Sequence, residues 1–188
     1  FVSSKSYEIL EMEYSKARSN LLPHSYHFLI MFSEVALQEG RIRRSIELTR
    51  EALSYAVDSN SKAYVYLTLA RQYRMLIEMQ NTRSELRRGF KELGMQYPKS
   101  GILSFISAAS SILVPLSYKK KEQVDLHAHS GITSEKLAVA LYEEASLSTY
   151  YMIDSPLLLL QISLRVRKIV SRIGPSIEML NYLAATAT

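Results

Sequence analysis

The sequence has no cysteine and few of the residues that make tight turns. Without cysteine the chain cannot form a disulfide framework or a thiolate metal site, and it fits a reducing compartment. Six glycines and five prolines in 188 residues are too few for the frequent turns of a many-stranded sandwich or barrel. The composition therefore favours long helices.

Long apolar runs are also missing from the sequence. The most apolar stretch, PLLLLQISL, is interrupted by Arg165 and falls well short of the roughly 20 residues that span a bilayer. The chain starts at Phe1 without an initiator methionine, and no basic-then-apolar signal segment stands there. We therefore expect a cytoplasmic piece of a longer protein, without a membrane span.

Positive charge is only slightly in excess. The 23 lysines and arginines against 18 aspartates and glutamates give +5, which permits weak attraction to acidic surfaces but falls short of a nucleic-acid signature. Apolar residues make up 47% and charged residues 22% of the chain, which disfavours general disorder. The length suits a single helical-repeat domain over residues 1–188, as part of a larger protein.

Apolar side chains in the first half recur at spacings of three and four, as they do on one face of a helix. The pattern predicts helices over 4–20 and 24–38, and the second is apolar almost all round and therefore buried. Gly40 fits the stop of that helix. A further helix over 42–56 carries an apolar inner stripe and an opposite face with charges at ion-pair spacing.

The next helices are delimited by turn and capping residues. After a polar turn at 58–61, a helix carries an inner stripe that runs to Ile77. Thr82 and Glu85 form a capping box, which satisfies free backbone amides at the start of a helix. That helix ends at Gly94.

The second half predicts further helices on both sides of a junction. A helix over 101–113 has small residues suited to close packing, and 115–132 is a possible junction loop. Later helices begin after the cap Thr133, at Pro156 and at Pro175. With about eight helices and no convincing strand, we expect an all-α fold made of antiparallel helix pairs.

The helix pairs carry a weak internal repeat. Gly40, Ser45 and Ala52 stand where tetratricopeptide-type units place a turn glycine and small packing residues. The segment from Asn81 to Leu93 echoes them about forty residues later, looser than the strict period of about 34. We therefore expect the pairs to stack as a tetratricopeptide-like superhelix.

One segment has the glycine spacing of a phosphate-binding loop. Residues 89–94 read GFKELG, but Met95 and Gln96 stand where the motif requires lysine and serine or threonine. The segment also lies within a predicted helix rather than after a strand. Its amides are therefore not expected to bind phosphate.

Histidines offer a second candidate site. His127 and His129, with Asp125 nearby, could supply three metal ligands from an extended segment, although no fourth ligand is evident. Mobile loops often contain such residues, so both interpretations stay open. His24 and His27 fit a helix-entry cap and a side chain at the edge of the core.

Clustered carboxylates tune each other only when they are buried together, and on amphipathic helices they usually form solvated faces. A group of arginines is the best candidate for nucleic acid, but interleaved glutamates weaken any field directed at phosphate. We interpret Gly40 as an elbow between stacked helices and the arginines as its exposed side. The carboxylates are Glu8, Glu11, Glu13, Glu143 and Glu144, and the arginines are Arg41, Arg43, Arg44 and Arg50. No catalytic, cofactor-binding or metal residue is assigned, and no cofactor is expected.

Two stretches resemble a known family. SIELTREALSYAVDSNSKAYVYLTLARQYRMLIEMQNTRSELRRGFKELGMQYP (45–98) and ASLSTYYMIDSPLLLLQISLRVRKIVSRIGPS (145–176) are similar to a helical-repeat region of very large signalling proteins. In these hybrid histidine kinases, fungal ones above all, the region follows an AAA-type ATPase segment. An N-terminal serine/threonine-kinase-like domain precedes both. The segment 119–131 does not follow the family's pattern.

The resemblance implies a non-catalytic scaffold that transmits signals in a phosphorelay kinase. The expected partners are other domains of the same chain or a partner protein, with no nucleic acid and no membrane. None of the family's nucleotide-binding or phosphoacceptor motifs occurs in the chain, so no catalytic residue is carried over. A free-standing tetratricopeptide-type peptide adaptor remains an alternative. So does an all-α enzyme with a site assembled from scattered residues.

Overall fold

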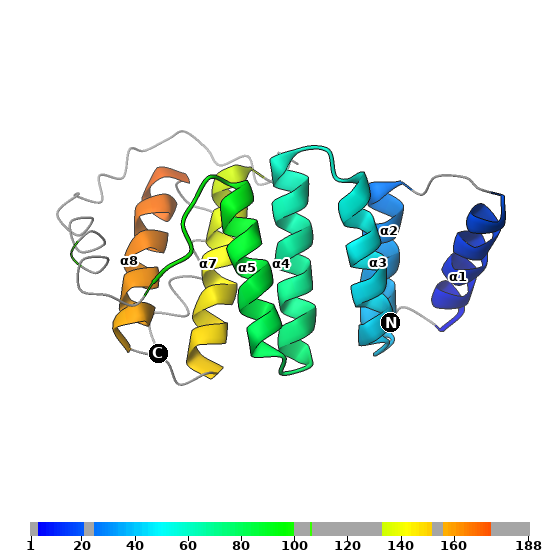
Figure 1. Cartoon of the computed structure of the whole chain (residues 1–188), viewed down its shortest axis with the longest axis horizontal. Helices are drawn as coiled ribbons and strands as arrows, with labels where there is room; N and C mark the ends of the chain where they lie inside the picture. The colour runs from blue at the N-terminus through cyan, green and yellow to red at the C-terminus, as the bar shows by residue number, and fades with distance from the viewer. Residues whose placement is uncertain (1–3, 21–24, 100–105, 107–132, 152–155, 174–188) are drawn as a thin grey trace, which may run out of the picture.

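The chain is a row of α-helices (Figure 1). The computed structural model describes residues 4–20, 25–99, 106, 133–151 and 156–173, and these contain seven helices and no strand. The helices are α1 (Ser4–Ser19), α2 (Tyr26–Gln38), α3 (Ile42–Tyr55), α4 (Ser59–Met75), α5 (Met79–Glu92), α7 (Ser134–Tyr151) and α8 (Pro156–Ile173). The all-α prediction is confirmed. The helices expected over 101–113 and after Pro175, and the junction at 115–132, lie outside the described residues.

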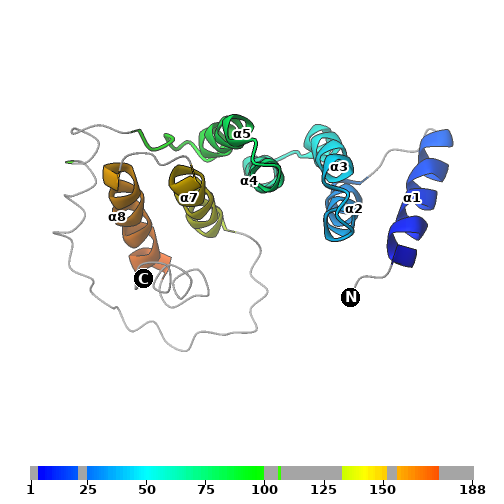
Figure 2. The same cartoon turned by 90° about the horizontal axis from the view of Figure 1, so that it is seen from below.

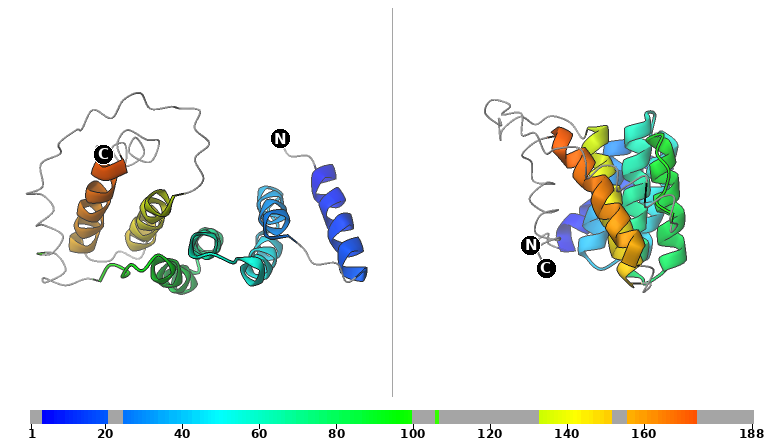
Figure 3. Two further views of the ribbon diagram at one scale, coloured as in Figure 1. Left: turned by 90° about the horizontal axis from the view of Figure 1, so that it is seen from above. Right: turned by 90° about the vertical axis from the view of Figure 1, so that its left-hand side faces the viewer.

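Neighbouring helices pack as pairs, and the pairs follow one another along a curve. α2 packs on α3, α4 on α5, and α7 on α8, while α4 also contacts α3 on one side and α7 on the other. Figure 2 shows α2, α4 and α7 toward the inner side of the curve, with α3 and α5 outside; Figure 3 shows the same order from above. None of the described helices is long and apolar enough to cross a bilayer.

The second helices of the first two pairs, α3 and α5, begin and end at the same offset, whereas the first helices, α2 and α4, begin 59 − 26 = 33 residues apart. α3 begins at Ile42 and α5 at Met79, and they end at Tyr55 and Glu92, so 79 − 42 and 92 − 55 both give 37. The sequence pattern predicts that the helix pair repeats after about forty residues. The boundaries show two successive helix pairs of similar spacing, while a repeated unit and its likeness to tetratricopeptide units stay predictions.

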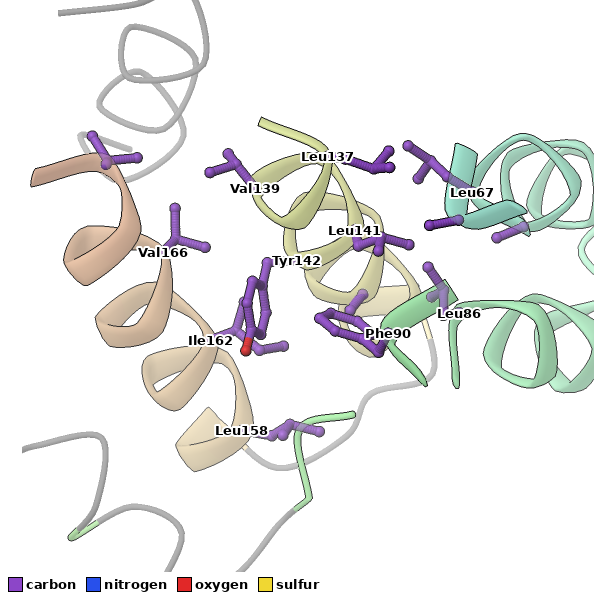
Figure 4. Close-up of a cluster of buried hydrophobic side chains, with 14 residues drawn as sticks. Leu67, Leu86, Phe90, Leu137, Val139, Leu141, Tyr142, Leu158, Ile162 and Val166 are labelled. Atoms are coloured by element: carbon purple, nitrogen blue, oxygen red, sulfur yellow. The ribbon is translucent and has the colours of Figure 1, made fainter. Parts of the chain in front are cut away.

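Two apolar clusters hold the row together, and α4 belongs to both. One cluster joins α4 to α1, α2 and α3, and α4 contributes Val65, Leu69 and Tyr73 to it. The other joins α4 to α5, α7 and α8, and includes Leu67 and Phe90. Figure 4 shows Phe90 beside Tyr142, with Ile162 of α8 beyond it; the rings of Phe90 and Tyr142 have centroids 4.7 Å apart. Burial of these side chains, at about 25 cal/mol per Å² of apolar surface, stabilises the array.

Gly40 ends α2 as the sequence predicts. Its φ of +74° lies in the left-handed region, which glycine adopts without steric cost. The Gly40 amide donates to the Leu37 carbonyl at 2.9 Å, and the Arg41 amide donates to the Ala36 carbonyl at 2.8 Å. These two bonds satisfy carbonyls at the helix end and reverse the chain.

Ile77 makes the same turn at the end of α4, which corrects the prediction that it lies on an inner stripe. Its φ is +61°, and 79% of it is exposed. The Ile77 amide donates to Arg74 and the Glu78 amide to Tyr73, the bonding pattern seen at Gly40. A β-branched residue is strained in this conformation. Sequence periodicity missed the turn because no glycine marks it.

The prediction of a capping box at Thr82 is wrong, because α5 begins three residues earlier, at Met79. Thr82 lies inside the helix, and both its amide and its hydroxyl donate to the Glu78 carbonyl. Glu85 bonds instead to the Arg88 guanidinium at 3.1 and 3.2 Å. The reversal at Ile77 lets the helix start immediately after the turn, without a side-chain cap.

We predict opposite effects from exchanging these two turn residues. Ile77→Gly should raise the free energy of unfolding by about 1 kcal/mol, because it removes the left-handed strain of an exposed side chain. Gly40→Ile should lower it by about 1–2 kcal/mol; a Cβ at Gly40 meets nothing within 4 Å, so only the backbone is affected. Urea unfolding of both variants measures the two changes. Destabilisation by Ile77→Gly would show that the Ile77 side chain supports the fold.

Candidate functional site

The segment GFKELG is part of helix α5 and of its end. Gly89 is buried where α5 meets its neighbours, and a Cβ there would come within 2.9 Å of a methyl carbon of Leu141 on α7. Gly94, with φ +68°, turns the chain after the helix, where its amide donates to the Lys91 carbonyl. Both glycines therefore have packing or turn roles, and the prediction that the segment lies within a helix is confirmed as far as Glu92.

Of the histidines singled out in the sequence, the structure describes only His27. It is exposed on α2, and its ring meets the Tyr26 ring edge-on with centroids 5.2 Å apart. His24, His127, His129 and Asp125 lie outside the described residues. Within the described ranges, no three histidine, aspartate or glutamate side chains gather as a potential metal site.

Glu144 corrects the view that the clustered carboxylates form solvated faces. Only 3% of its side chain is exposed, and it lies against two arginines of α4. The Arg74 Nε donates to Oε1 of Glu144, and the Arg71 Nε lies 3.8 Å from Oε2. Residues 70 positions apart in sequence thus join α7 to α4 by an ion pair.

Among the acidic residues of α1, some are exposed and one is bonded to another helix. Glu8 and Glu13 are exposed, as expected of a solvated face. Glu11 instead accepts hydrogen bonds from the Tyr7 hydroxyl at 2.8 Å and from Arg44 of α3 at 2.9 Å. Glu143 of α7 is half-buried.

The prediction that the arginines after Gly40 form the exposed side of an elbow is only partly correct, because Arg44 contacts another helix. Arg44 pairs with Glu11 of α1 and with Glu47, and its guanidinium lies 4.9 Å from the ring centre of Tyr14. Partial burial acts to lower the pKa of Arg44, but the hydrogen bond to Glu47 and the charge of Glu11 raise it overall. These contacts attach α1 to α3 rather than prepare a surface for phosphate.

Arg41 and Arg50 also contact other helices, although both are exposed. The Arg41 guanidinium stacks 4.3 Å from the ring centre of Tyr7 on α1, and Arg50 donates a hydrogen bond to the Tyr73 hydroxyl of α4. Arg43 is exposed on α3. The arginine group thus stabilises contacts between helices, which the sequence alone did not reveal.

A buried polar cluster lies where α4 meets the α2–α3 pair, and no sequence motif marked it. The Gln72 amide nitrogen donates to the Ser45 hydroxyl at 2.7 Å and to the Thr49 hydroxyl at 2.9 Å. The Ser45 hydroxyl in turn donates to the Ser33 carbonyl of α2 at 2.6 Å. One side chain of α4 is therefore bonded into the first pair, and buried bonds of this kind fix the relative position of helices.

Comparison with protein-family profiles, curated proteins and solved structures finds no match to this chain. The described residues form helix pairs in which the buried polar side chains of Gln72 and Glu144 bond to neighbouring helices.

We predict that Glu144→Ala weakens the attachment of α7 to α4. The change leaves Arg74 and Arg71 without their carboxylate, so the free energy of unfolding should fall by about 2–3 kcal/mol, less than for a fully buried pair because both arginines reach solvent. Glu8→Ala, at an exposed position of α1, is the control and should change the free energy of unfolding by less than about 0.5 kcal/mol. Chemical denaturation measures both. A Glu144→Ala variant as stable as the wild type would contradict the prediction that this ion pair holds α7 and α4 together.

We also predict loss of stability at alkaline pH. Burial, with a smaller contribution from Tyr64, raises the pKa of Tyr26 to about 12, and its hydroxyl donates across helices to the Ser61 carbonyl. A folded pKa above the unfolded value of about 10 gives a contribution that is complete below pH 10 and is lost as pH rises toward 12. Tyr26→Phe should lose less stability over this window than the wild type, as measured by urea unfolding. An identical pH slope in both would contradict the prediction.

Proposed function

We propose that this chain is a non-catalytic helical scaffold that works through contacts with other protein segments. The observation that carries the proposal is the curved row of helix pairs, in which α2, α4 and α7 follow one another along the inner side (Figure 2). Repeated pairs of this kind create extended concave surfaces for binding. Two of the polar side chains considered for chemistry, Arg44 and Glu144, are bonded to neighbouring helices.

The resemblance of residues 45–98 and 145–176 supports a more specific context. We propose that the scaffold lies in the cytoplasm as a segment of a hybrid histidine kinase, between an ATPase module and downstream sensor and kinase modules. There it would transmit a signal by interdomain contact. Sequencing the gene on both sides of this chain tests the context directly, since flanking ATPase and kinase motifs are expected.

A second candidate is a free-standing adaptor that binds peptides. The 37-residue offset shared by α3 and α5 favours it, because stacked units of one design commonly present a binding groove. The two candidates differ in where the bound segment comes from. In the scaffold it belongs to the same chain, and in the adaptor to another protein.

A photoreactive amino acid at Met31 or Met75 separates the candidates. Both side chains are about half exposed, on α2 and α4. In the parent protein we expect cross-links to another module of the same chain, whereas cross-links only to a separate polypeptide would support the adaptor. The same probe at the exposed Arg43 of α3 is the control. The chain should also hydrolyse no ATP and transfer no phosphate above a buffer control, and activity clearly above it would contradict both candidates.

A further inference from the structure

A third face of α4 lies between the faces that the two apolar clusters use, and Tyr64 at its start packs against both clusters. Val65 and Leu69 lie in one cluster and Leu67 in the other, which leaves a stripe of residues at helical spacings of three and four. This inner stripe of α4 consists of Tyr64, Thr68, Arg71 and Met75, of which Thr68 is buried and Arg71 and Met75 are exposed. It lies on the inner side of the curve, because Tyr64 bonds to α2 and Arg71 pairs with α7, and these helices follow the inner side (Figure 3).

The inner stripe continues onto the neighbouring helices. At one end the Tyr64 hydroxyl donates to the Glu34 carboxylate of α2 at 3.2 Å, and Met31, 47% exposed, precedes Glu34 by one helical turn. At the other end Arg71 contacts Glu144 of α7. These contacts form one surface that runs across α2, α4 and α7, with α4 in the middle.

The charges at the α4–α7 end of the stripe do not cancel. Glu144 supplies one carboxylate to two arginines, and Arg74 makes the closer contact. Arg71 keeps 46% of its side chain exposed, and its Nε is 3.8 Å from Glu144. Within the described residues, Glu144 is the one carboxylate in ion-pair range of Arg71, so the two arginines share a single carboxylate at this end of the stripe.

Exposed apolar side chains lie beside this charge. α4 and α7 run in the same direction, since Asn60 and Ser134 of their first turns are hydrogen-bonded and Arg74 meets Glu144 further along both. Met75, four residues after Arg71, is 52% exposed, and Leu147, three residues after Glu144, is 43% exposed. Met75 therefore lies about one turn beyond Arg71, and Leu147 about one turn beyond Glu144.

We propose that the inner stripe of α4, with Leu147 of α7, binds a protein segment that carries an aspartate or glutamate next to a large apolar side chain. The carboxylate pairs with Arg71, and the apolar side chain packs on Met75 and Leu147. A polyanion such as nucleic acid fits poorly, because the Glu34 carboxylate lies on the same surface and the rest of the contact is apolar. This inference rests on the proposed scaffold function and names the chemistry of its partner.

Selection of short random peptides on the immobilised 188-residue chain tests the proposal. We expect the selected peptides to be enriched in an acidic residue beside leucine, methionine or phenylalanine. Arg71→Gln should weaken their binding about tenfold or more, whereas Arg71→Lys should retain part of it. Leu147→Ser should weaken it as well. Arg43→Gln, which removes an exposed arginine of α3, is the matched control and should leave binding unchanged. Thermal unfolding of each variant checks that the fold is kept.

The outcomes separate this inference from the proposed function. Peptides that bind Arg71→Gln as tightly as the wild type, or that lose affinity for Arg43→Gln instead, overturn the inference while leaving a protein-binding scaffold in place. Peptides without acidic residues also overturn it. Failure to select any peptide, together with no cross-link from Met31 or Met75 in the parent protein, overturns both.

Discussion

The structure depends on α4 packing in two directions at once. Its Val65 and Leu69 face the α1–α3 side, while Ala63 and Leu67 face α5, α7 and α8. An α-helix has room for two such apolar faces only if little of its surface is left exposed, and in α4 only Ser59, Arg71 and Met75 are exposed. The first helix pair joins the rest of the row through the contact of α3 with α4, and both α4 and α5 then contact α7.

The two sides of α4 are fixed by different polar contacts. Toward α3 the buried contact is neutral, with Gln72 bonded to the hydroxyls of Ser45 and Thr49, and the exposed Arg50 adds a hydrogen bond to the Tyr73 hydroxyl. Toward α7 it is ionic, with Arg74 and Arg71 on Glu144. Apolar packing is not directional, whereas these bonds tolerate little displacement. We infer that the clusters supply most of the free energy, and that the polar contacts select one position of each helix against the next.

Local patterns in the sequence predicted the helices well because apolar periodicity and glycine stops act over a few residues. Gly40 and Gly94 mark their turns, and both were identified. The turn at Ile77 was missed, since a β-branched residue in the left-handed region contradicts local preference and is held there by its surroundings. Contacts between distant residues were also missed. The pairs Arg44–Glu11 and Arg74–Glu144 are separated by 33 and 70 positions, and no local spacing predicts which charges will meet.

A surface for partners follows from the architecture rather than from a motif. In a single curved row of helix pairs, each inner helix uses two faces for its neighbours and leaves a third toward the inner side. Arg71 and Met75 occupy that third face of α4, so their exposure results from the way α4 is shared. Residues on such a face need no fixed spacing beyond the helical repeat, which is why a motif search finds nothing there. Their significance lies in the combination of an unbalanced charge with apolar neighbours, which becomes visible only after α7 has been placed beside α4.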